Sequence, residues 1–470
     1  MKEITRFSVW ALVGVVTLVG VVSAIDQGVK PVWALFSALL LPCLIIALVK
    51  FPAAFIPPVL FISQGISLPV NPYRRLLDPT ELTLGAVLLA TAVFFRLVKI
   101  SIQGKSPRLG NLFKGQAKGI AFYFLFAAVV TISFLWTRAP GYGGSKLLSL
   151  LTIGTLCFVA PFIVMSEERD LRHFTLAAVA LALLLSLSTI SGVNQGTYTA
   201  HYQPVHIGIG QLIGMAILLI LYLGCFDEQA WIKNLLFLAM PILAAGLIAS
   251  ETRDALFSLI IVLLGGLFIR PRRVRHLTPL IALGGCATIL TALLVVPGQW
   301  ITGYAAQRFR DKSVEVVQMV EGTSTDEGSG GRRLVFYQAA LEGFAQKPLL
   351  GWGVGGWETF YWHNDQQEPP EYPHFELLEV GVEEGLLGLI PLVVFLILGL
   401  RAAKKAFYEI SSRYSFVLPA LVYCLLLTTA SGDIDDNRFV WLWCGIAFVV
   451  CQIIKSDGQQ EAQLETAADS

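Results

Sequence analysis

Long apolar segments recur along the whole of this 470-residue chain, and they limit what it can fold into. Segments of roughly 17–25 apolar residues are long enough to cross a bilayer core about 30 Å thick as helices. Only 14% of the residues are charged, whereas soluble globular domains carry about 25%. The sequence therefore predicts an all-α polytopic membrane protein. The net charge of +1 gives no reason to expect nucleic acid as a partner.

We expect about fourteen membrane-spanning segments, and a fold of about 12–14 transmembrane helices. The expected segments are 7–24, 31–49, 52–66, 81–98, 119–136, 147–164, 174–191, 206–224, 235–250, 255–269, 279–297, 380–400, 416–431 and 440–454. The first segment is similar to a signal peptide, but we expect an uncleaved helix because the later charges then fall on consistent sides. The third contains Pro52, Pro57 and Pro58, which favours a broken or re-entrant helix.

Lysine and arginine residues in the short loops predict the orientation of these segments. Strongly basic loops occur at 96–118, 270–275 and 401–405, and all of them are cytoplasmic if the N-terminus is cytoplasmic. The chain then divides into the first eleven transmembrane helices (1–297), a large periplasmic loop carrying short helices (298–379), the C-terminal transmembrane helices (380–454) and a disordered cytoplasmic tail (455–470). Both termini are therefore expected in the cytoplasm.

The same orientation places three polar regions outside: 192–205, the turn 251–254, and the large loop 298–379. The large loop has roughly 80 residues, far more than an ordinary connection. Long loops of this kind are commonly where function is located. We therefore expect an active site on the outer side of the membrane.

Arg253 lies between two apolar segments, at the expected outer end of the helix bundle. An arginine at this level can simply extend its guanidinium group to the membrane interface. Alternatively, the guanidinium group binds a phosphate, because it stays charged and offers two parallel donors. Arg253 is therefore a candidate ligand of a phosphate, with the interface as the competing explanation.

An arginine pair, Arg332 and Arg333, precedes apolar residues at helical spacing, which predicts an amphipathic helix ending near Pro348. The segment Gly351–Trp357 follows and contains four glycines. These glycines either let the backbone approach a ligand closely or form a plain loop, which is the interpretation we favour.

His374 stands at the outer entrance of the next apolar segment, and Glu383 follows nine residues later inside it. A carboxylate in an apolar helix is costly unless it is paired or faces water. An imidazole with an ordinary pKa near 6.5 suits general-base catalysis at neutral pH. The pair therefore points to chemistry at the membrane surface.

Together, these motifs resemble the O-antigen ligase and polymerase family over roughly residues 240–400. Arg253, after a threonine at an outer helix end, matches the first family motif. Arg333 and the turn Pro348–Gly353 match an arginine-led helix that ends in Pro-Leu-Leu-Gly-x-Gly. His374 and Glu383 match a histidine followed, nine residues later, by Glu-x-Gly-x-x-Gly.

The resemblance implies a GT-C-like fold in the bacterial inner membrane and an inverting transfer of a glycan from undecaprenyl diphosphate. It implies that Arg253, Arg333 and Arg332 bind the diphosphate, and that His374 deprotonates the acceptor hydroxyl. Glu383 would contact the substrate or help to fix the helix that carries His374. Because the lipid diphosphate is already a good leaving group, we expect no cofactor and no metal.

The sequence departs from the family pattern at two places. The family histidine is usually followed by Asn, whereas Phe375 follows His374, and a His-Asn pair occurs earlier at His363. The outer region 192–205 has no arginine, and His201 and His206 are present at or beside it instead, which we expect to be structural or to contact the substrate. These departures leave His363 open as the functional histidine, and they favour a polymerase slightly over a ligase.

The last outer loop contains the acidic sequence Asp433-Ile434-Asp435-Asp436, followed by Arg438. Such a cluster can bind a divalent metal, but a hydrated turn is the commoner structure. We therefore expect no metal there, and a substrate contact by Arg438.

The expected partners are the lipid-linked donor and an acceptor, which is either a growing repeat-unit chain or lipid A–core. Membrane lipid, a flippase and a chain-length regulator complete the expected set. A transporter or flippase of the lipid-linked glycan is the alternative function. Transporters usually have internal repeats and polar residues at the membrane midplane, whereas the ionisable residues here gather in the outer loops.

Overall fold

The computed structural model describes residues 50–57, 91, 94, 116–190, 205–223, 230–250, 252–268, 329–363, 372–409, 414–430, 433–434 and 437–468. Every regular element in this part of the chain is helical. The expected segments at 7–24, 31–49 and 279–297, nearly all of 81–98, and His201 lie outside the described residues.

Among the described residues, four helical stretches are long and apolar enough to cross a membrane: Pro140–Val164, Glu168–Ile190, Glu376–Tyr408 and Arg438–Lys455. Four shorter apolar helices accompany them. The helices and their bounds are η1 (Pro52–Phe55), α6 (Ala117–Ser133), α7 (Pro140–Ser149), η2 (Leu150–Gly154), α8 (Thr155–Val164), α9 (Glu168–Ile190), α10 (Val205–Leu223), α11 (Ala230–Ala249), α12 (Arg253–Phe268), α15 (Ser329–Gln346), α16 (Gly356–Trp362), α17 (Glu376–Glu409), α18 (Val417–Leu427) and α19 (Arg438–Ala468). The all-helical membrane class is confirmed, while the number of spans and the orientation stay predictions.

Two expected bounds differ from the structure. The segment expected at 147–164 begins seven residues earlier, at Pro140, because a proline fits the first turn of a helix, where its missing N–H has no partner to lose. It continues through the π-helical turn η2 into α8. The tail expected to be disordered continues α19 to Ala468, over a sequence rich in the helix formers Ala, Gln and Glu.

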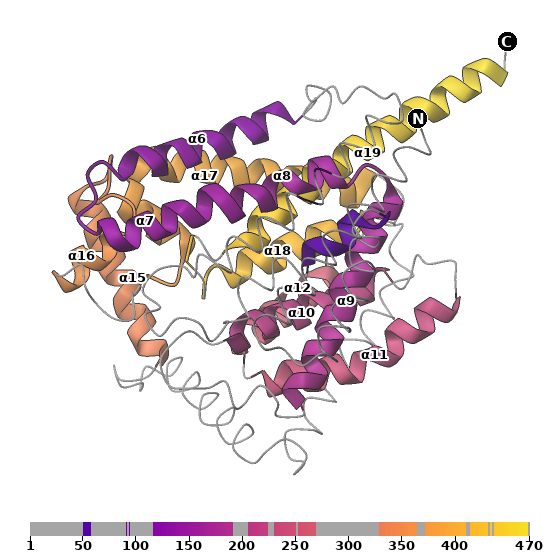
Figure 1. Ribbon diagram of the computed structural model, residues 1–470, viewed down its shortest axis with the longest axis horizontal. Helices are drawn as coiled ribbons and strands as arrows, with labels where there is room; N and C mark the ends of the chain where they lie inside the picture. The colour runs from indigo at the N-terminus through magenta and orange to yellow at the C-terminus, as the bar shows by residue number, and fades with distance from the viewer. Residues whose placement is uncertain are drawn as a thin grey trace, which may run out of the picture.

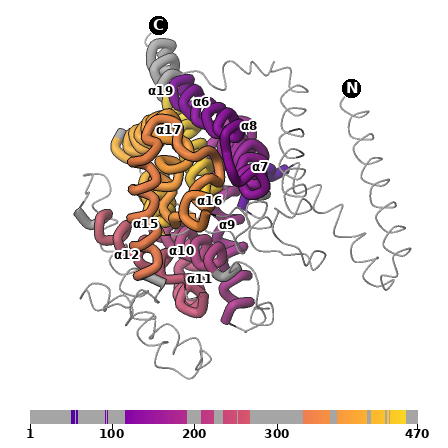
Figure 2. Tube along the Cα trace, turned by 90° about the vertical axis from the view of Figure 1, so that its left-hand side faces the viewer, coloured from indigo at the N-terminus to yellow at the C-terminus, as the bar shows by residue number. Residues whose placement is uncertain are grey.

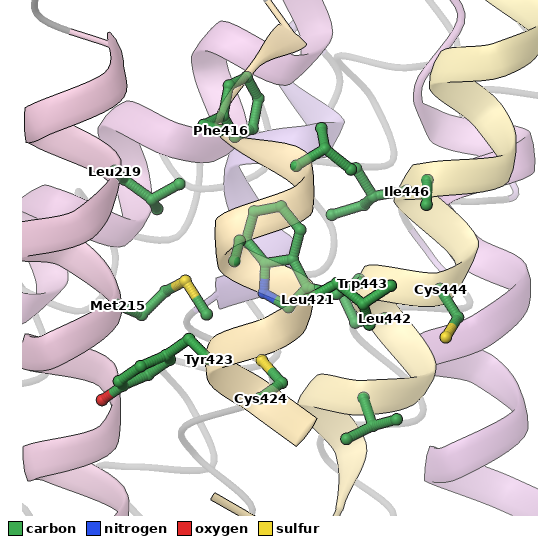
Figure 3. Packing of buried hydrophobic residues seen from close by; sticks show 14 of the residues in the cluster. Met215, Leu219, Phe416, Leu421, Tyr423, Cys424, Leu442, Trp443, Cys444 and Ile446 are labelled. Atoms are coloured by element: carbon green, nitrogen blue, oxygen red, sulfur yellow. The ribbon is translucent and has the colours of Figure 1, made fainter. Parts of the chain in front are cut away.

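The helices form two groups that α18 joins (Figure 1). In one group α17 packs on α6 and α19, and α19 packs on α8. In the other, α10 packs on α9, α11 and α12, while α18 contacts α10, α12, α17 and α19. Figure 3 shows this junction, where Met215 and Leu219 of α10 face Leu421 and Tyr423 of α18.

An aromatic cluster fixes the first group. Tyr123 of α6, Phe158 of α8, Phe395 of α17 and Trp441 of α19 are all buried, and Tyr123 stacks on Phe158 with ring centroids 4.3 Å apart. Aromatic pairs of this kind stabilise by about 0.5–1.5 kcal/mol beyond their buried area. The helices that carry the polar groups described below are therefore held by a rigid apolar core.

Candidate functional site

The candidate site lies at one end of the bundle, where α15 and α16 cover the beginnings of α7 and α17 (Figure 2). The expected amphipathic helix after the arginine pair is confirmed as α15, which ends at Gln346, just before Pro348. Phe336 of α15 is buried against Trp357 and Tyr361 of α16, and Val382 of α17 belongs to the same small core. This core fixes α15 over the first turns of α17.

The glycine turn after α15 docks on a break in α17. Gly385 has φ 64° and ψ −158° in the middle of that helix, and Gly351 has φ 64° in the turn. Backbone N–H groups of Trp352 and Gly353 donate to the carbonyls of Val382 and Glu383, at 3.0 and 2.7 Å. In return, Leu386 N–H donates to the carbonyl of Pro348 at 2.8 Å.

No side chain fits between these two backbones. A Cβ on Gly351 would overlap the backbone of Glu383, and a Cβ on Gly385 would come within 2.5 Å of the backbone of Leu349. The Pro-Leu-Leu-Gly-x-Gly and Glu-x-Gly motifs therefore pack backbone against backbone. We call this contact between the glycine turn and the break in α17 the joint. The backbone that these glycines let approach is that of α17, a contact that neither the plain-loop nor the ligand interpretation predicted.

His374 packs against the aromatic side chains of Phe336 and Tyr372, with an unusual backbone conformation. Its φ is 60°, a region that few non-glycine residues occupy and that often marks functional sites. Its ring stacks on the ring of Phe336, with centroids 6.2 Å apart, and the centroid of the Tyr372 ring lies 4.2 Å away. Its Nδ1 atom is buried and has no hydrogen-bond partner among the described residues.

Burial and the positive charges of Arg333 and Arg332 together lower the pKa of His374 to about 4, against the opposing effect of Asp433. The imidazole is therefore neutral at pH 7, which is the form that accepts a proton. The same electrostatic coupling shows that the structure brings Arg332, Arg333 and His374 together. The guanidinium carbon of Arg332 lies 5.4 Å from the centre of the Phe336 ring, which also stacks on His374.

His363, the alternative histidine, differs in its surroundings. It ends α16 with φ 54°, and its side chain is exposed. His374 is mostly buried between aromatic rings, in the electrostatic field of the arginine pair. Phe375, where the family usually has Asn, contacts Tyr337 with ring centroids 6.0 Å apart.

A buried ion cluster lies beneath the site and was missed by the sequence reasoning. Nζ of Lys146, on α7, lies 2.8 Å from Glu383 and 3.0 Å from Asp433, and it also binds Glu379. All four side chains are at most 4% exposed. Tyr142, one turn before Lys146, donates its hydroxyl to Asp433.

A signal for this cluster was present in the sequence. Glu379 and Glu383 are four residues apart, so they lie on one face of α17. Carboxylates in an apolar helix need a partner, and Lys146 is a cation between Pro140 and Val164, in another helix long enough to cross a membrane. Glu383 therefore has a definite neighbour, and its expected supporting role stays a prediction.

Asp433, the first residue of the acidic loop, contacts Lys146. Burial acts to raise the pKa of Asp433, but Lys146 and hydrogen bonds from Glu379 and Tyr142 outweigh it and hold the pKa below its usual range. Asp435 and Asp436 lie outside the described residues, among which no three His, Cys, Asp or Glu side chains are grouped to hold a metal. Arg438 begins α19 and is buried.

Arg253 begins α12 with its side chain half-buried, and His206 lies in the first turn of α10. The beginning of α12 is tied to α10 because Gln211 Nε2 donates to Asp254 at 3.3 Å. Tyr423 of α18 donates to the carbonyl of Gln211 at 3.1 Å.

Helix α18 also reaches the arginine helix. Just beyond its end, the carbonyl of Thr429 accepts a hydrogen bond from Tyr337 of α15 at 2.7 Å. The helices that carry Arg253 and Arg333 are therefore both attached to α18, and the roles of Arg253, His206 and Arg438 stay predictions.

Residues 235–393 match the family model described as O-antigen ligase. The resemblance to the O-antigen ligase and polymerase family is confirmed. The match runs from α11 into α17, so it includes Arg253, Arg333, His374 and Glu383 but neither Lys146 nor Asp433. A comparison with curated proteins found no match. The family indicates glycan transfer of the ligase or polymerase type by a membrane protein.

Proposed function

We propose that this protein transfers a glycan from undecaprenyl diphosphate to an acceptor hydroxyl at the outer leaflet of the bacterial inner membrane. The observation that carries the proposal is the arrangement around Phe336, whose ring contacts both the guanidinium group of Arg332 and the imidazole of His374. A group that binds anions and a group that accepts protons thus lie in one aromatic site. Glycan transfer from a lipid diphosphate requires these two functions.

In the proposed reaction, the bond between the anomeric carbon and the diphosphate oxygen breaks, and the diphosphate leaves with that electron pair. Arg332 and Arg333, with Arg253 as a further cation, neutralise the charge that develops on it. The acceptor oxygen attacks the opposite face of the anomeric carbon, which inverts its configuration. His374 takes the proton of the acceptor hydroxyl.

The pKa of His374, about 4 instead of the expected 6.5, keeps the imidazole neutral before the acceptor arrives but makes it a weaker base in the free protein. Binding of the anionic diphosphate beside the arginine pair offsets their positive charge. The imidazole then becomes more basic once the donor is in place. Proton transfer is thereby favoured in the complete complex.

The acceptor is either a growing repeat-unit chain, which makes the protein a polymerase, or lipid A–core, which makes it a ligase. We favour the polymerase slightly, because the outer region 192–205 lacks the arginine that many ligases have. A flippase would supply the donor, and a chain-length regulator would be the partner of a polymerase. A deletion strain distinguishes the two, since loss of a polymerase leaves single repeats and loss of a ligase leaves bare core.

The test is glycan transfer by purified protein in liposomes that contain a lipid-linked donor and an acceptor. Histidine should be replaced by asparagine, because asparagine tolerates a positive φ and has no basic nitrogen. We expect His374→Asn to lower the transfer rate by about 10²–10⁴-fold, the usual contribution of a general base. His363→Asn is the matched control and should transfer normally.

The proposal fails if His374→Asn transfers like the wild type, or if His363→Asn is the variant that loses activity. Movement of the donor across the bilayer without a new glycosidic bond would support a flippase instead.

A further inference from the structure

A second group of cations lies near the end of α17 that is remote from His374, because Arg401 and Lys405 are in the last turns of that helix. Figure 1 shows this end of α17 beside α6 and α19. A cavity of about 460 Å³ opens there between α6, α17 and α19, and the side chains of Lys118, Arg401, Lys405 and Lys455 line it. None of the lining residues in this part of the structure is acidic. The cavity therefore has a strongly positive rim.

The four cations stand where the apolar parts of the helices end. Lys118 is in the first turn of α6, and Lys455 closes the apolar stretch of α19. Arg401 and Lys405 are one turn apart on α17, directly after its apolar run. Such positions lie at the level of the lipid headgroups, on the side that the basic loops predict to be cytoplasmic.

The floor of the cavity is apolar and closely packed. Leu398 and Ala402 of α17 contribute to it, and Cys451 of α19 donates a hydrogen bond to the carbonyl of Ala402 at 3.2 Å. A Cβ on Gly119 of α6 would overlap the ring of Phe448 of α19, so these helices approach closely beside the cavity. The floor is formed by packed helices, so the rim can receive a ligand without rearrangement.

We propose that this cavity binds the phosphate group of an anionic phospholipid. A positive rim above an apolar floor matches an amphiphile whose phosphate meets the cations while its glycerol and acyl groups cover the floor. Basic pockets between transmembrane helices on the cytoplasmic side bind lipid headgroups in this way. The bound lipid joins α6, α17 and α19 at the end far from the proposed catalytic residues.

The experiment measures lipid retained by the full-length protein, purified in neutral detergent, by native mass spectrometry and by thermal unfolding. Phosphatidylglycerol, phosphatidylcholine and inorganic phosphate are compared as ligands. We expect phosphatidylglycerol to remain bound and to raise Tm, with little effect of the other two. The double variant Lys118→Gln/Arg401→Gln should bind phosphatidylglycerol about 25-fold more weakly, at about fivefold for each cation removed.

The matched control is Lys404→Gln, since Lys404 is exposed on the same helix but does not line the cavity. It should bind phosphatidylglycerol like the wild type. Equal stabilisation by phosphatidylcholine would overturn the proposal, as would stabilisation by inorganic phosphate alone. An equal loss of binding in Lys404→Gln would also overturn the proposal, because the lipid would then be attracted by the overall surface charge and not by the cavity. These outcomes are independent of glycan transfer, so the proposal stands or fails separately from the proposed function.

Discussion

The arginine pair of α15 and the lysine of α7 are at the same end of the molecule, yet they are placed in opposite ways. Arg332 is exposed and Arg333 is half-buried, whereas Lys146 is buried and contacts three carboxylates. A buried charge is tolerated only where partners neutralise it. The comparison suggests that Lys146 acts within the protein, holding helices together, while the arginines act on a ligand from outside.

The variant Lys146→Met tests this comparison most directly, because it leaves Glu379, Glu383 and Asp433 without their cation. Removing one partner of a buried ion pair costs about 3–5 kcal/mol. We expect a large loss of folded protein, measured as the loss of a thermal transition in detergent. Lys146→Arg keeps the charge and should retain most of the stability. A Met variant as stable as the wild type would show that the cluster does not hold these helices.

The double variant Arg332→Gln/Arg333→Gln tests the other half of the comparison. Surface substitutions usually change stability by about 0.5 kcal/mol or less, so thermal unfolding should be nearly unchanged. Loss of a group that stabilises developing negative charge costs about 10²–10³ in rate, and glycan transfer should fall by that factor. Strong destabilisation with normal transfer per folded molecule would reverse the roles assigned to the two regions.

Gly385→Ala tests the joint between the turn after α15 and the break in α17. The added methyl group meets the backbone of Leu349, at a positive φ where a side chain is strained. A strained backbone conformation costs about 1–3 kcal/mol, so the midpoint of thermal unfolding should fall. Gly381→Ala is the control on the same helix, because the nearest atom to its Cβ is 3.6 Å away. Equal stability of the two variants would contradict the joint.

The pH dependence of transfer gives the smallest effect. Because the pKa of His374 is about 4, it should be neutral and active down to about pH 5, and kcat/KM should stay flat where an ordinary histidine would already lose activity. Arg333→Gln removes a neighbouring positive charge, which favours the protonated imidazole and raises the pKa. The acid limb of the variant should therefore move to higher pH. An acid limb at the same pH in the variant and the wild type would show that Arg333 does not influence the pKa of His374.

Much of the helical fold follows from local sequence. The apolar run expected at 206–224 forms α10 (Val205–Leu223), and the run at 235–250 lies in α11 (Ala230–Ala249), because hydropathy and helix length are properties of one segment. The arginine-led helix was predicted for the same reason. Helical periodicity needs no knowledge of the partner surface.

The contacts between segments could not be obtained in this way. Lys146 and Glu383 are far apart in the chain, and only packing shows that they meet. The glycines of the turn allow a close approach of the backbone to another group. The sequence did not show that this group is the backbone of α17 and not a ligand. The low pKa of His374 likewise depends on burial, which the sequence alone did not reveal.

The position of Lys146 has a consequence for engineering. The segment that matches the family model, 235–393, carries Glu379 and Glu383 but not the lysine that neutralises them. A chimaera that exchanges this segment alone between two proteins would separate two acids from their counter-ion inside a membrane. Exchanges in this protein should therefore move α7 together with the segment, since the two are one electrostatic unit despite lying apart in the gene.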